Sequence, residues 1–281
     1  NYKAGVSAQL KSAVILAGLN SFGITQIIER EKSRDHTENM LIKNSETIKI
    51  KKGKKKLINI HGKKYLNSIN INVPGDPSSA AFFVALTLLS KNSILKIKKV
   101  GLNPTRIGFY QLLKKHGAKI KFNNIKKSNN EIYGDILVKS CKIKPIKATK
   151  EFYVKATDEY PVLFVIAALT KGVSVFKGIG DLANKESNRI KEMQKILKQI
   201  GIQSYASKNE IRIYGKNFID NQFTKINVPK LGDHRICMSA LVLSLITGIK
   251  TKIKNFDTVY TSAPSFLKII KSLGGNHEIK K

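Results

Sequence analysis

The feature that most constrains the fold of this chain is a block of sequence that recurs four times. Each block opens with a serine or an aspartate, continues into an apolar helix rich in small residues, and then reaches a short strand. The openings are Ser7, Asp76, Asp158 and Asp233, which lie 69, 82 and 75 residues apart. A unit that recurs at this spacing is one supersecondary motif that buries its apolar face against its neighbours. The chain is therefore expected to stack similar α/β units.

Each block contains further regular elements. Strands are expected at Ile24–Ile28, Ile94–Val100, Val173–Phe176 and Thr251–Ile253, and between blocks at Ile58–Ile60, Ile132–Val138 and Ile211–Tyr214. A second helix is expected to start near Ser33, Pro104, Glu186 and Pro264. Three of these helices are expected to stop at a glycine, at Gly117, Gly201 and Gly274.

The first helix of each block is apolar on nearly every side, so all four are expected in the interior with the sheets outside. Each of these helices begins at a block opening. Free backbone N–H groups and the helix dipole favour anions at such a terminus. Several helix N-termini that converge would form a phosphate pocket.

Composition excludes several classes of protein. The 281 residues are 42% hydrophobic and 25% charged, which is typical of a globular chain. The two cysteines, Cys141 and Cys237, exclude a disulfide scaffold and a CxxC zinc site. No apolar run reaches the roughly 18 residues of a membrane-spanning helix, so no transmembrane helix is expected. We also expect no signal peptide, and therefore a cytoplasmic protein without membrane contact.

The positive charge is large but dispersed. The formal net charge is +32, from 45 lysines and 6 arginines against 19 acidic residues. The lysines are spread along the chain without a nucleic-acid-binding motif, which favours a solvated surface over nucleic-acid binding; steering of anionic substrates is a further possibility. An arginine in such a lysine-rich chain suggests a site where the planar guanidinium group binds a phosphate or carboxylate through two hydrogen bonds. Four arginines stand in unusual strings: SRDHTE, NPTRIG, NKESNR and GDHR.

Seven ordered motifs carry a family resemblance. They are SAQLKSA (7–13), SRDHTENML (33–41), VPGDPSSAAF (73–82), GLNPTRIG (101–108), DEYPVL (158–163), NKESNR (184–189) and GDHRICMS (232–239). These strings resemble the enolpyruvyltransferase family, and within it the branch that acts on shikimate-3-phosphate. The resemblance implies an α/β (α+β) fold of two lobes, each with three βαβαββ-like units around buried helices.

The resemblance also implies a domain organisation. Six units are typical of the family and four are found, so about 150 residues are expected to be missing before Asn1. Residues 1–71 would be the remaining part of the first lobe, and residues 72–281 would be the second lobe, with three units. With its first lobe incomplete, the chain alone is expected to be inactive. The full-length protein is expected to be a monomer.

By resemblance, the reaction joins phosphoenolpyruvate to the 5-hydroxyl of shikimate-3-phosphate. Phosphate leaves after a tetrahedral intermediate, without a metal or an organic cofactor. The family pattern places the shikimate-3-phosphate ligands at Ser7, Ala8, Gln9, Arg34, Asp158 and Lys185. It places the phosphoenolpyruvate ligands at Gln9, Arg189 and Arg235, and the catalytic groups at Asp158, Lys185 and Glu186.

Each of these assignments has a plainer alternative. Ser7 and Asp158 could be ordinary helix caps, and Arg34 could form an ion pair with Asp35 or Glu38. Lys185 and Glu186 could be an ordinary surface pair. Glu159 is expected to be a solvated neighbour of Asp158, and Arg106 to be structural. The family typically has an aspartate directly before the arginine that is Arg189 here, and this chain has Asn188 at that position. The partner of Arg189 is therefore expected to be weaker.

Three other functions stay open at this stage. The family also has a branch that acts on a UDP-sugar and uses a loop cysteine; the DEYP and KES strings favour the shikimate branch. A basic nucleic-acid-binding protein built on the same repeat is a second reading. A non-catalytic fragment is the third.

Overall fold

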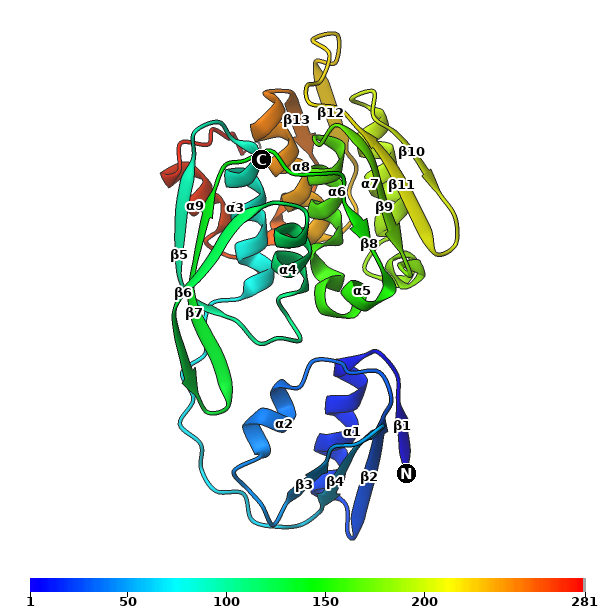
Figure 1. Cartoon of the computed structure of the whole chain (residues 1–281), viewed down its shortest axis with the longest axis vertical. Coiled ribbons are helices and arrows are strands. Elements are labelled where there is room, and N and C mark those ends of the chain that lie inside the picture. Colours follow the sequence, from blue (N-terminus) through cyan, green and yellow to red (C-terminus); the bar gives the residue numbers. More distant parts are fainter. Residues whose placement is uncertain (280–281) are drawn as a thin grey trace.

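The computed structural model describes residues 1–279, which form two bodies joined by an extended segment (Figure 1). The smaller body runs from strand β1 (Tyr2–Ala4) to strand β4 (Lys56–His61), and the larger body begins at helix α3 (Pro77–Leu89). Each body has its own hydrophobic core. The boundary expected between residues 71 and 72 falls in the joining segment and remains a prediction.

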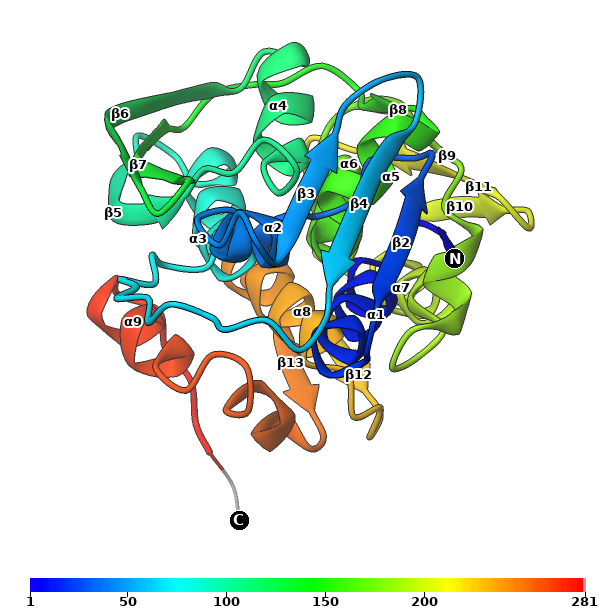
Figure 2. The same cartoon turned by 90° about the horizontal axis from the view of Figure 1, so that it is seen from below.

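The smaller body is one βαβαββ unit. In chain order it comprises β1, α1 (Ala8–Asn20), β2 (Ile24–Glu29), α2 (His36–Leu41), β3 (Ile48–Lys51) and β4. The sheet order is β1-β2-β4-β3, with β1 parallel to β2 and the other neighbours antiparallel. The sheet lies on the side of this body away from the larger body, and the helices lie between (Figures 1 and 2).

The first unit of the larger body has a three-stranded sheet. It contains α3, β5 (Ile94–Gly101), α4 (Gly108–Lys115), β6 (Lys119–Ser128) and β7 (Glu131–Lys139), with the antiparallel order β5-β7-β6. A single parallel bridge between Gly75 and Val100 takes the place that β1 has beside β2.

The next unit repeats the topology of the smaller body. It contains β8 (Lys147–Ala148), α5 (Lys150–Ala156), the 3-10 turn η1 (Thr157–Glu159), α6 (Tyr160–Ala168), β9 (Gly172–Lys177), η2 (Gly180–Asn184), α7 (Arg189–Lys198), β10 (Gln203–Ala206) and β11 (Glu210–Gly215). The order β10-β11-β9-β8 has one parallel pair, β8 with β9, as in the first sheet. The last unit contains β12 (Lys225–Val228), α8 (His234–Thr247), β13 (Lys250–Ile253), η3 (Phe256–Val259) and α9 (Phe266–Ser272).

These elements confirm the predicted α/β repeat. All seven expected strands are present, and the three glycines expected to stop helices have φ values of 97°, 70° and 89° at Gly117, Gly201 and Gly274. A left-handed φ is accessible to glycine without the steric cost of a Cβ atom, which is why glycine ends these helices.

The prediction of buried first helices is confirmed in the larger body and wrong in the smaller one. Helices α3, α6 and α8 pack against one another, and every residue of α6 is buried. In α1, by contrast, Leu10 is 60% exposed and Leu16 is 50% exposed. The difference arises because α1 packs against its own sheet and contacts α2 through the polar side chains of Lys11 and Ser12, whereas both α6 and α8 pack along α3.

The two bodies meet through polar side chains. Asn103 donates to the carboxylate of Asp35 at 2.9 Å, and His36 Nδ1 lies 2.8 Å from Glu131 Oε1. The residues of the larger body in these contacts lie near the β6–β7 hairpin and after β5. These contacts hold the segment before α2 against the larger body, which brings Arg34, the residue before Asp35, within hydrogen-bonding distance of Asp158 in the larger body.

Candidate functional site

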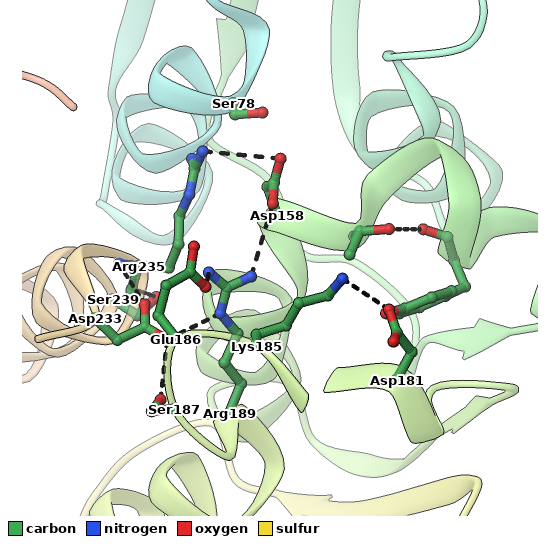
Figure 3. A network of polar contacts seen from close by, with 12 residues as sticks. Ser78, Asp158, Asp181, Lys185, Glu186, Ser187, Arg189, Asp233, Arg235 and Ser239 are labelled. Carbon is green, nitrogen blue, oxygen red and sulfur yellow. Dashed lines mark hydrogen bonds and ion pairs between the residues drawn. The ribbon is translucent and has the colours of Figure 1, made fainter. Parts of the chain in front are cut away.

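Three arginines surround the carboxylate of Asp158, which lies in η1 just before α6. Arg34 Nη2 donates to Asp158 Oδ2 at 2.6 Å. Arg189 Nη1 lies 3.7 Å from Oδ1, and Arg235 Nη2 lies 3.8 Å from Oδ2 (Figure 3). The arginines come from the loop after β2, the start of α7 and the first turn of α8. The fold thus gathers four of the predicted site residues from both bodies.

Asp158 is ionised at neutral pH. Burial opposes ionisation of this carboxyl, but the charges of Arg235, Arg34 and Arg189 outweigh burial and hold its pKa far below the ordinary value. The side chain makes no capping hydrogen bond to the helix backbone. The alternative of an ordinary helix cap is therefore wrong for Asp158. The alternative for Arg34, an ion pair with Asp35 or Glu38, is also wrong, because its guanidinium pairs with Asp158.

Arg189 is held by two further carboxylates. Its Nε donates to Asp233 Oδ2 at 3.0 Å, and its Nη2 pairs with Glu186. Asp233 is completely buried, caps α8 by accepting from the backbone N–H of Arg235 at 3.0 Å, and also accepts from Ser187 Oγ. The Arg189 side chain is 1% exposed, and its charge is neutralised within the protein by Asp158, Glu186 and Asp233.

Sequence reasoning missed Asp233 as a residue of this site. Its signal was the position two residues before Arg235 in the GDHR string, at the start of an apolar helix. Because Asn188 replaces the aspartate typical of the family, the sequence predicted a weaker partner for Arg189. Asn188 caps α7 through the backbone N–H of Lys191, while Asp233 supplies the buried carboxylate for Arg189.

Lys185 points toward a different partner. Its Nζ lies 2.7 Å from Asp181 Oδ2 (Figure 3). The same oxygen accepts from the hydroxyl of Tyr153 at 2.8 Å. The hydrogen bond from Lys185 lowers the pKa of Asp181. The alternative of a surface pair between Lys185 and Glu186 is wrong, because each side chain pairs with another residue. Asp181 was also missed by the sequence reasoning.

The predicted phosphate ligands at the start of α1 stand apart from this cluster. Ser7 is the N-cap of α1 and accepts from the backbone N–H of Leu10 at 3.4 Å. Within residues 1–279, the side chains of Ser7 and Gln9 make no hydrogen bond to the cluster around Asp158. The start of α1 lies on the side of the smaller body that faces the larger one (Figure 1).

Two expectations about neighbouring residues have different outcomes. Glu159 was expected to be solvated, and this is wrong: it is 1% exposed. Burial raises its pKa, and the negative charge of Asp158 raises it further. Arg106 binds the N-cap of α3, at 2.8 Å from Asp76 Oδ1 and 2.7 Å from Ser78 Oγ, so it stabilises that helix start.

The described part of the chain offers no metal site, since no three His, Cys, Asp or Glu residues within it are grouped to hold an ion. None of its helices has the length and apolar character needed to cross a membrane. The arrangement that remains is a carboxylate among arginines, with Lys185 and Glu186 beside it. These side chains together can bind two anions and transfer protons to and from them.

Comparison with known proteins gives one family. A sequence model of the family described as EPSP synthase (3-phosphoshikimate 1-carboxyvinyltransferase) matches residues 2–270. The 3-phosphoshikimate 1-carboxyvinyltransferase of Petrotoga mobilis is 40% identical over 279 residues, which cover 97% of this chain and 62% of that protein. That of Bacillus subtilis is 35% identical, over 95% of this chain and 61% of that protein.

Solved structures agree with this result. The 2.37 Å structure of EPSP synthase from Acinetobacter baumannii matches all of this chain and 63% of its own, with a TM-score of 0.87 and 36% identity. The enolpyruvyl transferase NikO from Streptomyces tendae has a TM-score of 0.71 at 15% identity, a likeness of fold alone. The chain thus spans about three fifths of the length of the relatives it matches.

Proposed function

The chain belongs to the EPSP synthase family, and on that basis we propose that the complete protein transfers the enolpyruvyl group of phosphoenolpyruvate to the 5-hydroxyl of shikimate-3-phosphate and releases phosphate. The observation that carries the proposal is Asp158 ringed by Arg34, Arg189 and Arg235 from both bodies. The relatives named above favour this reaction over the UDP-sugar reaction. Its place in the cytoplasm and its monomeric state are further proposals.

Asp158 is proposed to accept the proton of the 5-hydroxyl. Its low pKa makes it a weak base while three guanidinium groups share its charge, because proton transfer is most efficient when the pKa lies near the working pH. Substrate phosphate and carboxylate groups would take up the arginine charges. The pKa of Asp158 would then rise toward the useful range as the two anions bind.

Glu186 is proposed to exchange a proton with the methylene carbon of phosphoenolpyruvate. In the first step the 5-oxygen adds to C2 while C3 gains a proton. In the second step C3 loses a proton and the phosphate leaves as the double bond forms. The Glu186 side chain is 50% exposed and lies beside Arg189, so it can reach a substrate bound by the arginines. Lys185 is proposed to bind shikimate-3-phosphate near the reacting centre once it leaves Asp181.

Ser7, Ala8 and Gln9 are proposed to bind the phosphate of shikimate-3-phosphate. The support is the first turn of α1, where the helix leaves the backbone N–H groups of Ala8 and Gln9 without an intrahelical partner and the Ser7 hydroxyl lies beside them. Arg189 and Arg235, with Gln9, are proposed to bind phosphoenolpyruvate.

The test is phosphate release by the protein expressed from the complete reading frame that contains residues 1–281. With both substrates present, release is expected; with either substrate omitted, it is not. Asp158→Asn is the matched variant, because it keeps the side-chain shape and removes the charge. If the parent protein released no phosphate with both substrates, the proposal would be wrong.

A further inference from the structure

The smaller body contains four charged side chains that neutralise one another in its interior. Lys11 Nζ lies 2.7 Å from Glu29 Oε1 and 2.8 Å from Glu38 Oε1. Lys56 Nζ lies 2.9 Å from Glu38 Oε1 and 3.5 Å from Glu29 Oε2. Lys11, Glu29 and Glu38 are at most 2% exposed. These four side chains, which we call the buried charge network, come from α1, β2, α2 and β4.

Stability is a weak explanation for such a network. Removing ions from water costs several kcal/mol each, and replacing a buried ion pair with apolar residues of similar size is often neutral or stabilising. The hydrophobic core around this network is small, with six buried apolar residues. The network therefore calls for a structural role that apolar packing could not fill, such as fixing a polar segment.

Two hydrogen bonds connect the network to the loop that carries Arg34. Glu29 Oε1 accepts from the backbone N–H of Ser33 at 3.0 Å and from its hydroxyl at 2.8 Å. Ser33 is 1% exposed and directly precedes Arg34. Residues 30–35 have neither helix nor strand structure, and these two bonds anchor Ser33 in the middle of this loop. Glu38 fixes the other end of the loop, since it lies on α2.

We propose that Glu29, held in place by the buried charge network, is a positioning residue for Arg34 and acts through Ser33. The network holds Ser33, and Ser33 sets the point from which the Arg34 side chain crosses to Asp158 in the larger body. The catalytic consequence rests on the function proposed above, whereas the positioning itself does not. The ionised state of Glu29 supports it: burial opposes ionisation, but Lys11 and the Ser33 donors hold its pKa below the ordinary value.

The choice of variant decides whether this proposal can be tested. Glu29→Gln removes a buried charge and could unfold the smaller body. Ser33→Ala removes only the hydroxyl bond and leaves the network intact. The matched control is Ser12→Ala, since Ser12 Oγ lies 2.7 Å from Thr37 Oγ1 and also links α1 to the start of α2, without touching the network.

The first measurement is a pair of thermal double-mutant cycles on the 281-residue chain. Ser33→Ala is combined with Asp158→Asn, and Ser12→Ala is combined with Asp158→Asn. We expect the Tm shifts of the first pair to be non-additive, because Ser33→Ala also loosens the contact that Asp158→Asn removes. The Tm shifts of the control pair should be additive. Additive shifts in both cycles would overturn the proposal.

The second measurement is kinetic, on the complete protein. Ser33→Ala is expected to raise KM for shikimate-3-phosphate by about threefold to tenfold while kcat changes little, since Arg34 binds and does not react. Ser12→Ala should leave both constants unchanged. A kcat loss with unchanged KM would contradict positioning of Arg34. If the parent protein had no activity, the proposed function would fail, while the thermal cycles would still decide whether the bond between Ser33 and Glu29 positions Arg34.

Discussion

Arg34 of the smaller body and Asp158 of the larger body share a 2.6 Å hydrogen bond across 124 residues of sequence. The bond links the loop that follows β2 to the turn that starts α6, so each body supplies one half of the charge pair. Two other arginines lie within 3.8 Å of the same carboxylate. The ionisation of the Asp158 carboxylate therefore depends both on the contact between the two bodies and on the positive charge of the site.

Replacing Asp158 with Asn should tighten anion binding and stop turnover. The substitution removes the one negative charge that all three arginines share, so the field they present to an anion becomes more positive. We expect inorganic phosphate to bind the chain several-fold more tightly in a calorimetric titration. In the complete protein, turnover should fall by about 10²–10⁴-fold, the usual contribution of a general base.

The control for this titration is Asp220→Asn, because among residues 1–279 the side chain of Asp220 bonds only within its own loop. Its phosphate affinity should equal that of the parent. Unchanged affinity in Asp158→Asn would show that the carboxylate does not oppose anion binding.

Arg189 and Arg235 should differ in their effect on stability. Arg189→Ala would leave Asp233 buried without its guanidinium partner, at a cost of about 3–5 kcal/mol. Arg235→Ala should cost about 1 kcal/mol or less, because its longer pair with Asp158 lies nearer to solvent. Urea unfolding of both variants measures the difference. Equal losses would mean that Arg189 is no more structural than Arg235.

Stability should fall in acid. The pKa values of Asp158, Asp76 and Glu29 are lower in the folded chain than in the free side chain. A carboxyl with a lowered folded pKa stabilises the fold above its unfolded pKa and loses that contribution as the pH falls through the folded pKa. We expect the Tm to drop as the pH is lowered below about 4. A Tm that stayed level from about pH 5 to pH 3 would argue against these pairings.

Glu159 should have the opposite pH dependence. Burial and the charge of Asp158 raise its pKa, so its neutral form is the one the fold prefers. Its contribution is present below the unfolded pKa and is lost as the pH rises through the folded pKa. Glu159→Gln, which stays neutral, should therefore gain stability relative to the parent between about pH 5 and pH 8. Denaturant unfolding at both pH values checks the sign, and a relative loss at the higher pH would contradict it.

Truncation to alanine at two adjacent residues of α1 should lower the free energy of unfolding by very different amounts. Ile15 is fully buried in the core of the smaller body, whereas Leu16 is half exposed. Ile15→Ala is expected to cost about 2–5 kcal/mol, while Leu16→Ala should lie within about 0.5 kcal/mol of the parent. Thermal unfolding of the 281-residue chain distinguishes them. A large loss for Leu16→Ala would show that the outer side of α1 is covered in solution.

The elements of the fold could be predicted because their signals are local. Alternating polarity predicted the strand that begins at Ile94. Gly117 predicted the end of α4, the helix that directly precedes this glycine. Burial was predicted from the same pattern and was wrong for α1. Leu10 and Leu16 are as apolar as the residues of α6, but burial depends on which helices pack alongside, and that is a property of the assembled units.

The sequence alone determined the α/β repeat, the four helix starts and the arginines set among lysines, because propensity, periodicity and side-chain chemistry act over a few neighbouring residues. The tertiary structure decided which charges meet. It paired Arg34 with Asp158, Arg189 with Asp233 and Lys185 with Asp181, and it buried Glu159. Ion pairing and desolvation depend on distances between residues far apart in the chain, and only the packing of the units sets those distances.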